Sequence, residues 1–131
     1  MRQLLLTAAA LSLEMLSFPA LAHHSAAMFD PSREITASAT VKTWQWTNPH
    51  SWLTVLIDDG HGGTVTAPME LGSPNTLFRS GWRDSTFKTG DRVTVLYHPR
   101  KDGTPGGALV EAVTASGHRM TWLPSAQKAN D

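Results

Sequence analysis

The chain of 131 residues contains no cysteine. Disulfides, lipid attachment through a lipobox cysteine and thiolate metal sites are therefore excluded. The chain also has no excess of either charge, because its 11 basic residues balance its 11 acidic ones. This balance argues against nucleic acid as a partner, since phosphate binding requires a basic face.

Signatures of the common catalytic sites are missing as well. Ser51 and Ser73 lack a glycine elbow, and the chain has no paired-carboxylate signature, phosphate loop or dinucleotide fingerprint. A hydrolase that paired Glu70 with His50 as acid and base would have no nucleophile motif. We therefore expect a binding or accessory module rather than an enzyme, with a metal-dependent enzyme as a further alternative.

The chain has one long apolar run, "LLLTAAALSL" at residues 4–13, which is too short to span a membrane. A basic residue precedes it, and Ala20 and Ala22 follow it with the spacing that signal peptidase requires. This pattern predicts a secretory signal over residues 1–22, cut between Ala22 and His23. We expect the mature protein to be periplasmic or secreted, without a membrane span.

The remaining residues predict an arm (23–34), a β-domain (35–123) and a flexible tail (124–131). Apolar and polar residues alternate with period two in residues 35–46, 51–57, 64–71, 90–99 and 107–115, and a short sixth strand is expected in 117–124. Pro68 inside the third strand suggests an edge or a bulge. Between strands three and four, Ser73 is a good N-cap, Pro74 suits the first helical position and Gly81 ends a short helix.

This element order predicts an all-β fold, a small OB-fold-like barrel of five to six strands, with another small barrel or sandwich as the alternative. Six apolar positions are the predicted core: Val41, Leu53, Val55, Val93, Val95 and Val110. A position of this kind loses about 1–3 kcal/mol of stability when it is truncated.

Four motifs, "AHHS", "WTNPHSW", "GSPN" and "GDRVTVLYHP", extend along nearly the whole mature chain. Through them the chain resembles a bacterial family of small exported proteins that is catalogued only as a domain of unknown function. Leu71 departs from the family, in which glycine is common at that position. The resemblance implies export but no activity, so the function must be argued from the residues.

Three side chains are predicted to share one rim of the barrel: His50 after the first strand, Glu70 at the end of the third and His98 at the end of the fourth. In OB-folds, the loops beside His50 and His98 flank the usual binding face. Two imidazoles and a carboxylate suit Zn²⁺ or Cu²⁺. The alternative is that both histidines only cap strand ends. His61 and His118 are predicted at the opposite end.

The mature amino terminus carries the second candidate metal ligands. If cleavage leaves His23 first, its α-amine and its ring nitrogen can bind one metal ion together, as a histidine brace. The further imidazole would come from His24, His50 or His98, with copper the expected metal and zinc second. Met28 could add a thioether, or could be a buried plug beside Phe29.

The brace has two alternatives: a disordered polar start, or a signal cut after Ala27 that removes both histidines.

Tryptophans supply an alternative binding surface. Trp44 and Trp46 are expected on one face of the first strand, opposite Val41, with Trp52 across the turn. Such a patch could stack on a glycan or meet a protein, or could cover the outside of the barrel. The sequence therefore leaves two binding functions: a periplasmic metal-binding accessory protein, or a metal-free interaction module.

Overall fold

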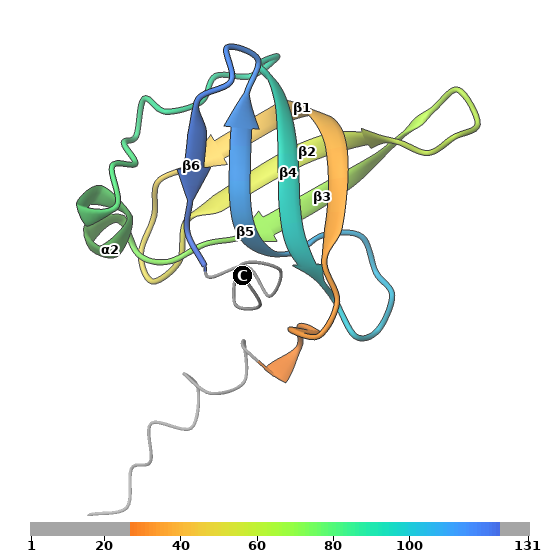
Figure 1. The fold of residues 1–131 in the computed structure, drawn as a ribbon, viewed down its shortest axis with the longest axis horizontal. Helices are drawn as coiled ribbons and strands as arrows, with labels where there is room; N and C mark the ends of the chain where they lie inside the picture. Colours follow the sequence, from red (N-terminus) through yellow and green to blue (C-terminus); the bar gives the residue numbers. More distant parts are fainter. Residues whose placement is uncertain (1–26, 124–131) are drawn as a thin grey trace, which may run out of the picture.

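Alternation of apolar and polar residues builds six strands in residues 27–123, the part of the chain that the computed structural model describes. The strands are β1 (Ile35–Gln45), β2 (Trp52–Asp58), β3 (Thr64–Glu70), β4 (Arg92–Pro99), β5 (Gly107–Thr114) and β6 (Arg119–Thr121). One short helix, α2 (Pro74–Arg79), lies between β3 and β4 (Figure 1). Within residues 27–123, no helix combines the length and the hydropathy that a membrane crossing requires.

The strands form one sheet in the order β3-β2-β1-β4-β5-β6, and a parallel pairing of β3 with β5 closes the first five into a barrel. This closure joins Met69 to Gly107 and Glu70 to Ala108. Pro68 comes directly before the closure, where β3 is still an edge strand, as expected of a residue without an N–H donor. The predicted OB-fold-like barrel is confirmed, with β6 as an extra strand on β5.

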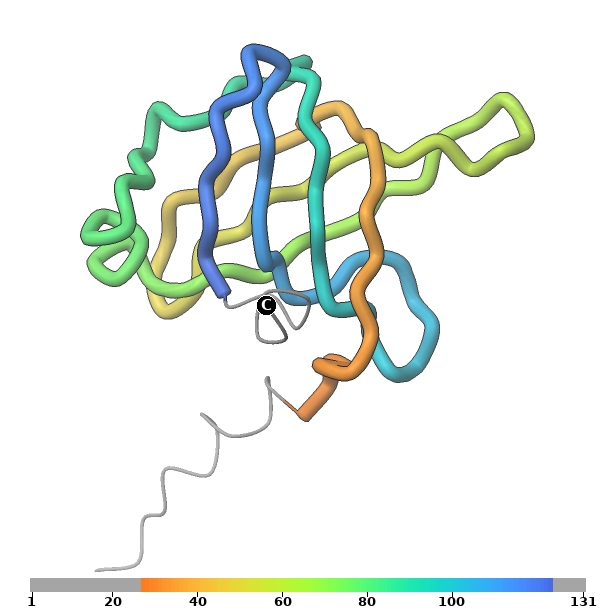
Figure 2. The backbone as a smooth tube through the Cα atoms, in the orientation of Figure 1, coloured from red at the N-terminus to blue at the C-terminus, as the bar shows by residue number. Residues whose placement is uncertain are grey.

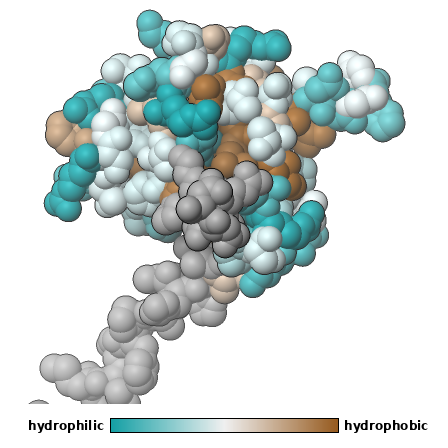
Figure 3. Space-filling model, in the orientation of Figure 1, coloured by the Kyte–Doolittle hydropathy of each residue, from teal (hydrophilic) through white to brown (hydrophobic). Residues whose placement is uncertain are grey.

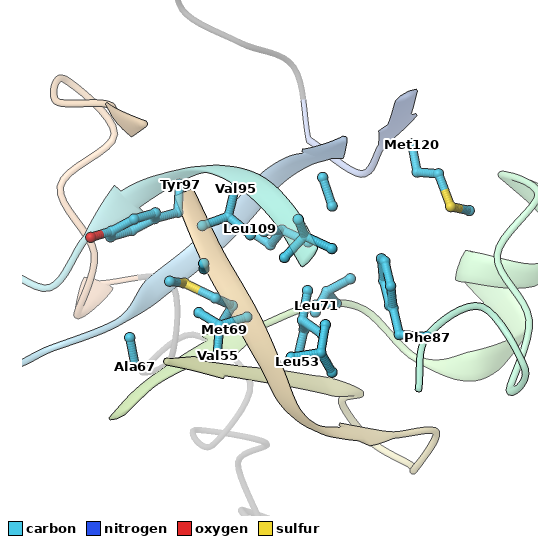
Figure 4. Close-up of a cluster of buried hydrophobic side chains, with 14 of the residues drawn as sticks. Leu53, Val55, Ala67, Met69, Leu71, Phe87, Val95, Tyr97, Leu109 and Met120 are labelled. Carbon is cyan, nitrogen blue, oxygen red and sulfur yellow. The ribbon is translucent and has the colours of Figure 1, made fainter. Parts of the chain in front are cut away.

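The barrel interior is filled by apolar side chains from all five barrel strands (Figure 4). Each of the six predicted core residues is buried, with at most 5% of its surface exposed. Val110 occupies an extra position in β5, where the register with β4 shifts between Leu96 and Tyr97. On the outside, apolar surface also gathers over β4 and its neighbouring strands, in the middle of the face drawn in Figure 3.

A bulge in β1 overturns the expected placement of two tryptophans. The register between β1 and β2 shifts between Val41 and Thr43, so one extra residue enters β1 there. Since side chains alternate with period two, an extra residue moves every later side chain to the other face. Trp44 and Trp46 therefore pack against the core that contains Val41, and the prediction that they lie opposite it is wrong.

Local signals set the ends of α2. The Ser73 hydroxyl accepts a hydrogen bond from the backbone N–H of Thr76 at 3.4 Å, and Pro74 is the first helical residue. The helix ends at Arg79, and the Gly81 N–H then donates to the Phe78 carbonyl at 3.2 Å. Leu77 in the helix and Trp82 after it are both fully buried, so this segment anchors to the barrel core.

Candidate functional site

A pocket of about 450 Å³ is lined by residues at the carboxyl ends of β3 and β4, at the start of β5 and just after β6. These strand ends point to the same end of the barrel (Figure 1). Its polar side chains are His50, Glu70 and His98. The rest of its lining is Phe29, Pro31, Leu71, Gly72, Ala108, Trp122 and Leu123. The structure thus brings together the three side chains that strand direction placed on one rim, and it surrounds them with apolar walls.

His50 and Glu70 form a pair at the mouth of the pocket. His50 follows a turn that contains a cis peptide bond between Asn48 and Pro49, and the Thr47 hydroxyl donates to the His50 carbonyl at 2.9 Å. Glu70 is the last residue of β3, and its Oε1 lies 2.7 Å from Nδ1 of His50. A carboxylate only accepts, so this contact places the proton of the neutral imidazole on Nδ1 and leaves Nε2 with a free lone pair.

His98 has the same arrangement on β4. Its Nδ1 lies 2.9 Å from the carbonyl oxygen of Arg33, the second residue before β1. A carbonyl oxygen only accepts, so Nδ1 carries the proton and Nε2 is again the free nitrogen. Only 7% of the His98 surface is exposed. The pocket therefore contains two imidazoles that are both anchored by Nδ1.

No group of three His, Asp or Glu side chains in residues 27–123 is close enough together to hold a metal ion. Oε1 of Glu70 contacts Nδ1 of the His50 ring. In this role the carboxylate orients a ligand instead of acting as one, which is common around metal-binding histidines. A metal ion in this pocket would need further donors. His23 and His24, which the sequence offers for that purpose, lie outside the described residues.

The described part of the arm, residues 27–34, lies beside the loop after β4 (Figure 2). It is held to the loop after β4, because the Asp30 N–H donates to the Pro99 carbonyl and the Lys101 N–H to the Met28 carbonyl, both at 2.9 Å. Phe29 is buried and lines the pocket. Met28 is 46% exposed, so the alternative of a buried methionine plug is wrong.

A turn directly after Phe29 fixes the direction of the arm. The Asp30 carboxylate accepts hydrogen bonds from the hydroxyl and the backbone N–H of Ser32. These hydrogen bonds, the hydroxyl one first, lower the pKa of the Asp30 carboxyl below its ordinary value of 3.8. The carboxyl is therefore ionised at neutral pH, and the sequence "DPS" at residues 30–32 forms a turn.

The other two described histidines lie elsewhere. His61 is in the exposed turn between β2 and β3, and His118 is in the exposed turn between β5 and β6. These two turns lie far apart in Figure 1, so the prediction that His61 and His118 share one end is wrong. The strong tilt of the strands separates turns that a simple up-and-down scheme places together.

Three tryptophans, Trp44, Trp46 and Trp82, form a partly buried aromatic cluster with Phe87. The ring centroid of Trp44 lies 5.7 Å from that of Trp46, 6.1 Å from that of Trp82 and 5.6 Å from that of Phe87. The Trp44 indole N–H donates to the Arg83 carbonyl at 3.0 Å. Trp44 thus joins β1 to the segment after α2, and Trp52 stands on β2, where it pairs with Glu70.

The two aromatic residues of the pocket lining, Trp122 and Phe29, were not predicted from the sequence. Trp122, just after β6, covers Gly72 so closely that a Cβ on this glycine would collide with the indole ring. Phe29 reaches the same pocket from the arm. The glycine before the helix cap was a signal that some group approaches the backbone closely, but it could not indicate which one.

Comparison with known proteins gives a family without an assigned role. The family model described as "Family of unknown function (DUF6152)" matches residues 10–111. No curated protein and no solved structure matches the chain. The function must therefore be argued from the pocket.

Proposed function

Because the chain belongs to DUF6152, a family of unknown function, we propose its function from its own residues: it is an exported accessory protein that binds a divalent metal ion, copper before zinc. One observation carries this proposal. His50 and His98 line one pocket, and each uses Nδ1 in a hydrogen bond that leaves Nε2 free. Neutral imidazole with a free, oriented nitrogen is the commonest metal ligand in proteins.

The remaining donors would come from the mature amino terminus. His23 lies six residues before Phe29 in the chain, and Phe29 is fixed in the pocket wall. Six residues can extend over about 20 Å, so an amino terminus at His23 can reach the pocket. There its α-amine and ring nitrogen would supply two donors, and His50, with 39% of its side chain exposed, the third.

The chemistry of this donor set favours copper. An amine and imidazoles are nitrogen donors, and at such sites the affinity for Cu²⁺ exceeds that for Zn²⁺. Glu70 would fix the His50 ring and raise its basicity. In this arrangement His98 is an alternative third ligand, and His24 is another.

The first prediction tests the brace. Copper titration by calorimetry, on protein with its native start and on protein with one extra residue before His23, should give affinities that differ by more than about tenfold. The extension leaves every histidine in place and only separates the α-amine from the His23 ring. His50→Ala should weaken binding similarly. His61→Ala is the matched control, because it removes an exposed histidine that lies outside the pocket.

Equal affinities for the native and extended forms would refute the brace. If no form binds copper above background, the protein is better described as an interaction module for a protein or a glycan. Mass spectrometry of protein purified from the periplasm would give the mature amino terminus and any bound metal together. A start at Met28 would remove the proposed ligands.

A further inference from the structure

We propose that the same pocket binds a protonated organic amine with an apolar body, and that this binding needs no metal ion. The inference goes beyond metal binding and does not depend on His23. It rests on the chemistry of the described pocket alone, which is complementary to a ligand that carries positive charge and hydrogen-bond donors at one end.

The side-chain atoms of His50, Glu70 and His98 that have no partner within residues 27–123 are hydrogen-bond acceptors. In the neutral imidazole, Nε2 of His50 and Nε2 of His98 carry lone pairs, because Nδ1 of each ring holds the single proton. Glu70 is a carboxylate that uses Oε1 on His50, so its second oxygen can accept another hydrogen bond. An ammonium group has only donors and therefore matches this set.

The charge of the pocket points the same way. Glu70 is the one acidic residue among the described lining residues, and that lining contains no lysine or arginine. The Glu70 side chain is only 12% exposed, so its charge is poorly screened by water. A carboxylate or phosphate ligand would meet a negative charge here without a cationic partner.

The walls of the pocket suit the apolar body of such a ligand. Phe29 and Trp122 come from the two ends of the described chain and supply aromatic surface, with Leu71 beside them. Aromatic faces attract cations as well as apolar groups. A volume of about 450 Å³ lies within the range of ordinary small-molecule sites.

The test uses three probes of similar shape: benzylammonium, benzyl alcohol and benzoate. Binding is measured by calorimetry on metal-free protein that carries one extra residue before His23, so the proposed brace cannot contribute. We expect benzylammonium to bind most tightly and benzoate most weakly. Glu70→Gln should weaken benzylammonium binding about tenfold, the value of a hydrogen bond to a charged group, and should weaken benzyl alcohol binding less.

Asp84→Asn is the matched control, because it removes an exposed carboxylate outside the pocket. Thermal unfolding shows whether the Glu70 variant is folded. Independently of any variant, nuclear magnetic resonance of the unsubstituted protein should show benzylammonium shifting the signals of the His50 ring and the Trp122 indole. Equal binding of the amine and the alcohol, or unshifted His50 and Trp122 signals, would overturn the proposal.

The two proposals fail separately. Loss of copper binding in the extended protein together with retained amine binding supports both. Copper binding without amine binding would support the proposed metal site and refute the proposed amine site. If both hold, benzylammonium should compete with copper in the protein with its native start, because both ligands would need Nε2 of His50.

Discussion

At the scale of single residues, the hydrogen bond on Nδ1 determines what His50 and His98 can do. Each ring is held by an acceptor, Glu70 in one case and the Arg33 carbonyl in the other. Strand direction in the sequence was sufficient to bring both histidines and Glu70 to one end of the barrel. It could not show that Glu70 orients His50, because that depends on the side-chain positions after the strands have paired.

Core residues were the most predictable single residues. Val95 lies in the middle of β4, and none of its surface is exposed. Val95→Ala should lower the free energy of unfolding by about 1–3 kcal/mol, because it removes buried methyl groups and leaves a cavity. Chemical denaturation measures this change. Thr36→Ala, at an exposed position of β1, should change stability by less than about 0.5 kcal/mol. A neutral Val95→Ala would contradict the assigned core.

At the scale of elements, period-two alternation was enough to locate the strands but not the bulge in β1. The alternation of "ATVKTWQW" changes phase at Lys42 and Thr43, two consecutive polar residues at the point where the register with β2 shifts. A strict period of two carried across this point assigns the later residues to the opposite face, whereas a bulge absorbs the extra residue and returns them to the face of Val41. This is why sequence reasoning placed Trp44 and Trp46 on the wrong face.

Deletion of Lys42 tests the role of the bulge. Without this residue, Thr43 would follow Val41 directly in regular register with β2, and Trp44 and Trp46 would keep the face that they share with Val41. We therefore expect the tryptophan fluorescence of the folded protein to stay unchanged, while stability changes through loss of the bulge and its local twist. Lys42→Ala is the control, since it keeps the chain length and alters only an exposed side chain. Tryptophan fluorescence shifted to the red after the deletion would contradict the assignment of Lys42 as the extra residue of the bulge.

The short helix α2 depends on its cap. Ser73→Ala removes the acceptor for the Thr76 N–H and should lower the free energy of unfolding by about 0.5–2 kcal/mol. Ser80 is the control, because it ends the helix through its backbone N–H and not through its side chain. If Ser73→Ala and Ser80→Ala have equal effects in thermal unfolding, the Ser73 hydroxyl does not stabilise the helix.

At the scale of the whole molecule, the stability should depend on alkaline pH through Tyr97, the one tyrosine of the chain. Burial raises the pKa of the Tyr97 phenol above its ordinary value of 10.0. The folded protein therefore holds this proton more firmly than the unfolded chain. Its contribution is fully present below pH 10.0, and stability should fall as pH rises above that value towards the folded pKa.

Denaturation at a series of alkaline pH values measures this fall, and phenolate absorbance of the folded protein reports the titration directly. Tyr97→Phe should unfold with less dependence on pH above 10.0, because it has no proton to lose. Equal alkaline destabilisation of the variant and the original protein would assign the effect to other groups.

Closure of the barrel was predicted as part of the fold class, but its position was not. It joins β3 to β5, which are far apart in the sequence, and no local pattern specifies such a pairing. Gly106 marks the place, since a Cβ there would collide with the Pro68 carbonyl. The aromatic walls of the pocket could not be predicted from the sequence either, because Phe29 and Trp122 come from opposite ends of the described chain.

The parallel pairing of β3 with β5 involves only two residue pairs, and Glu70 and Ala108, which form one of them, also line the pocket. The shortest strand pairing of the barrel therefore forms part of the pocket wall. A ligand that contacts His50 on one side of the β3–β5 pairing and His98 on the other would hold the two sides together. Ligand binding would then lower the frequency at which the β3–β5 pairing opens, and the ligand-free protein would unfold more easily.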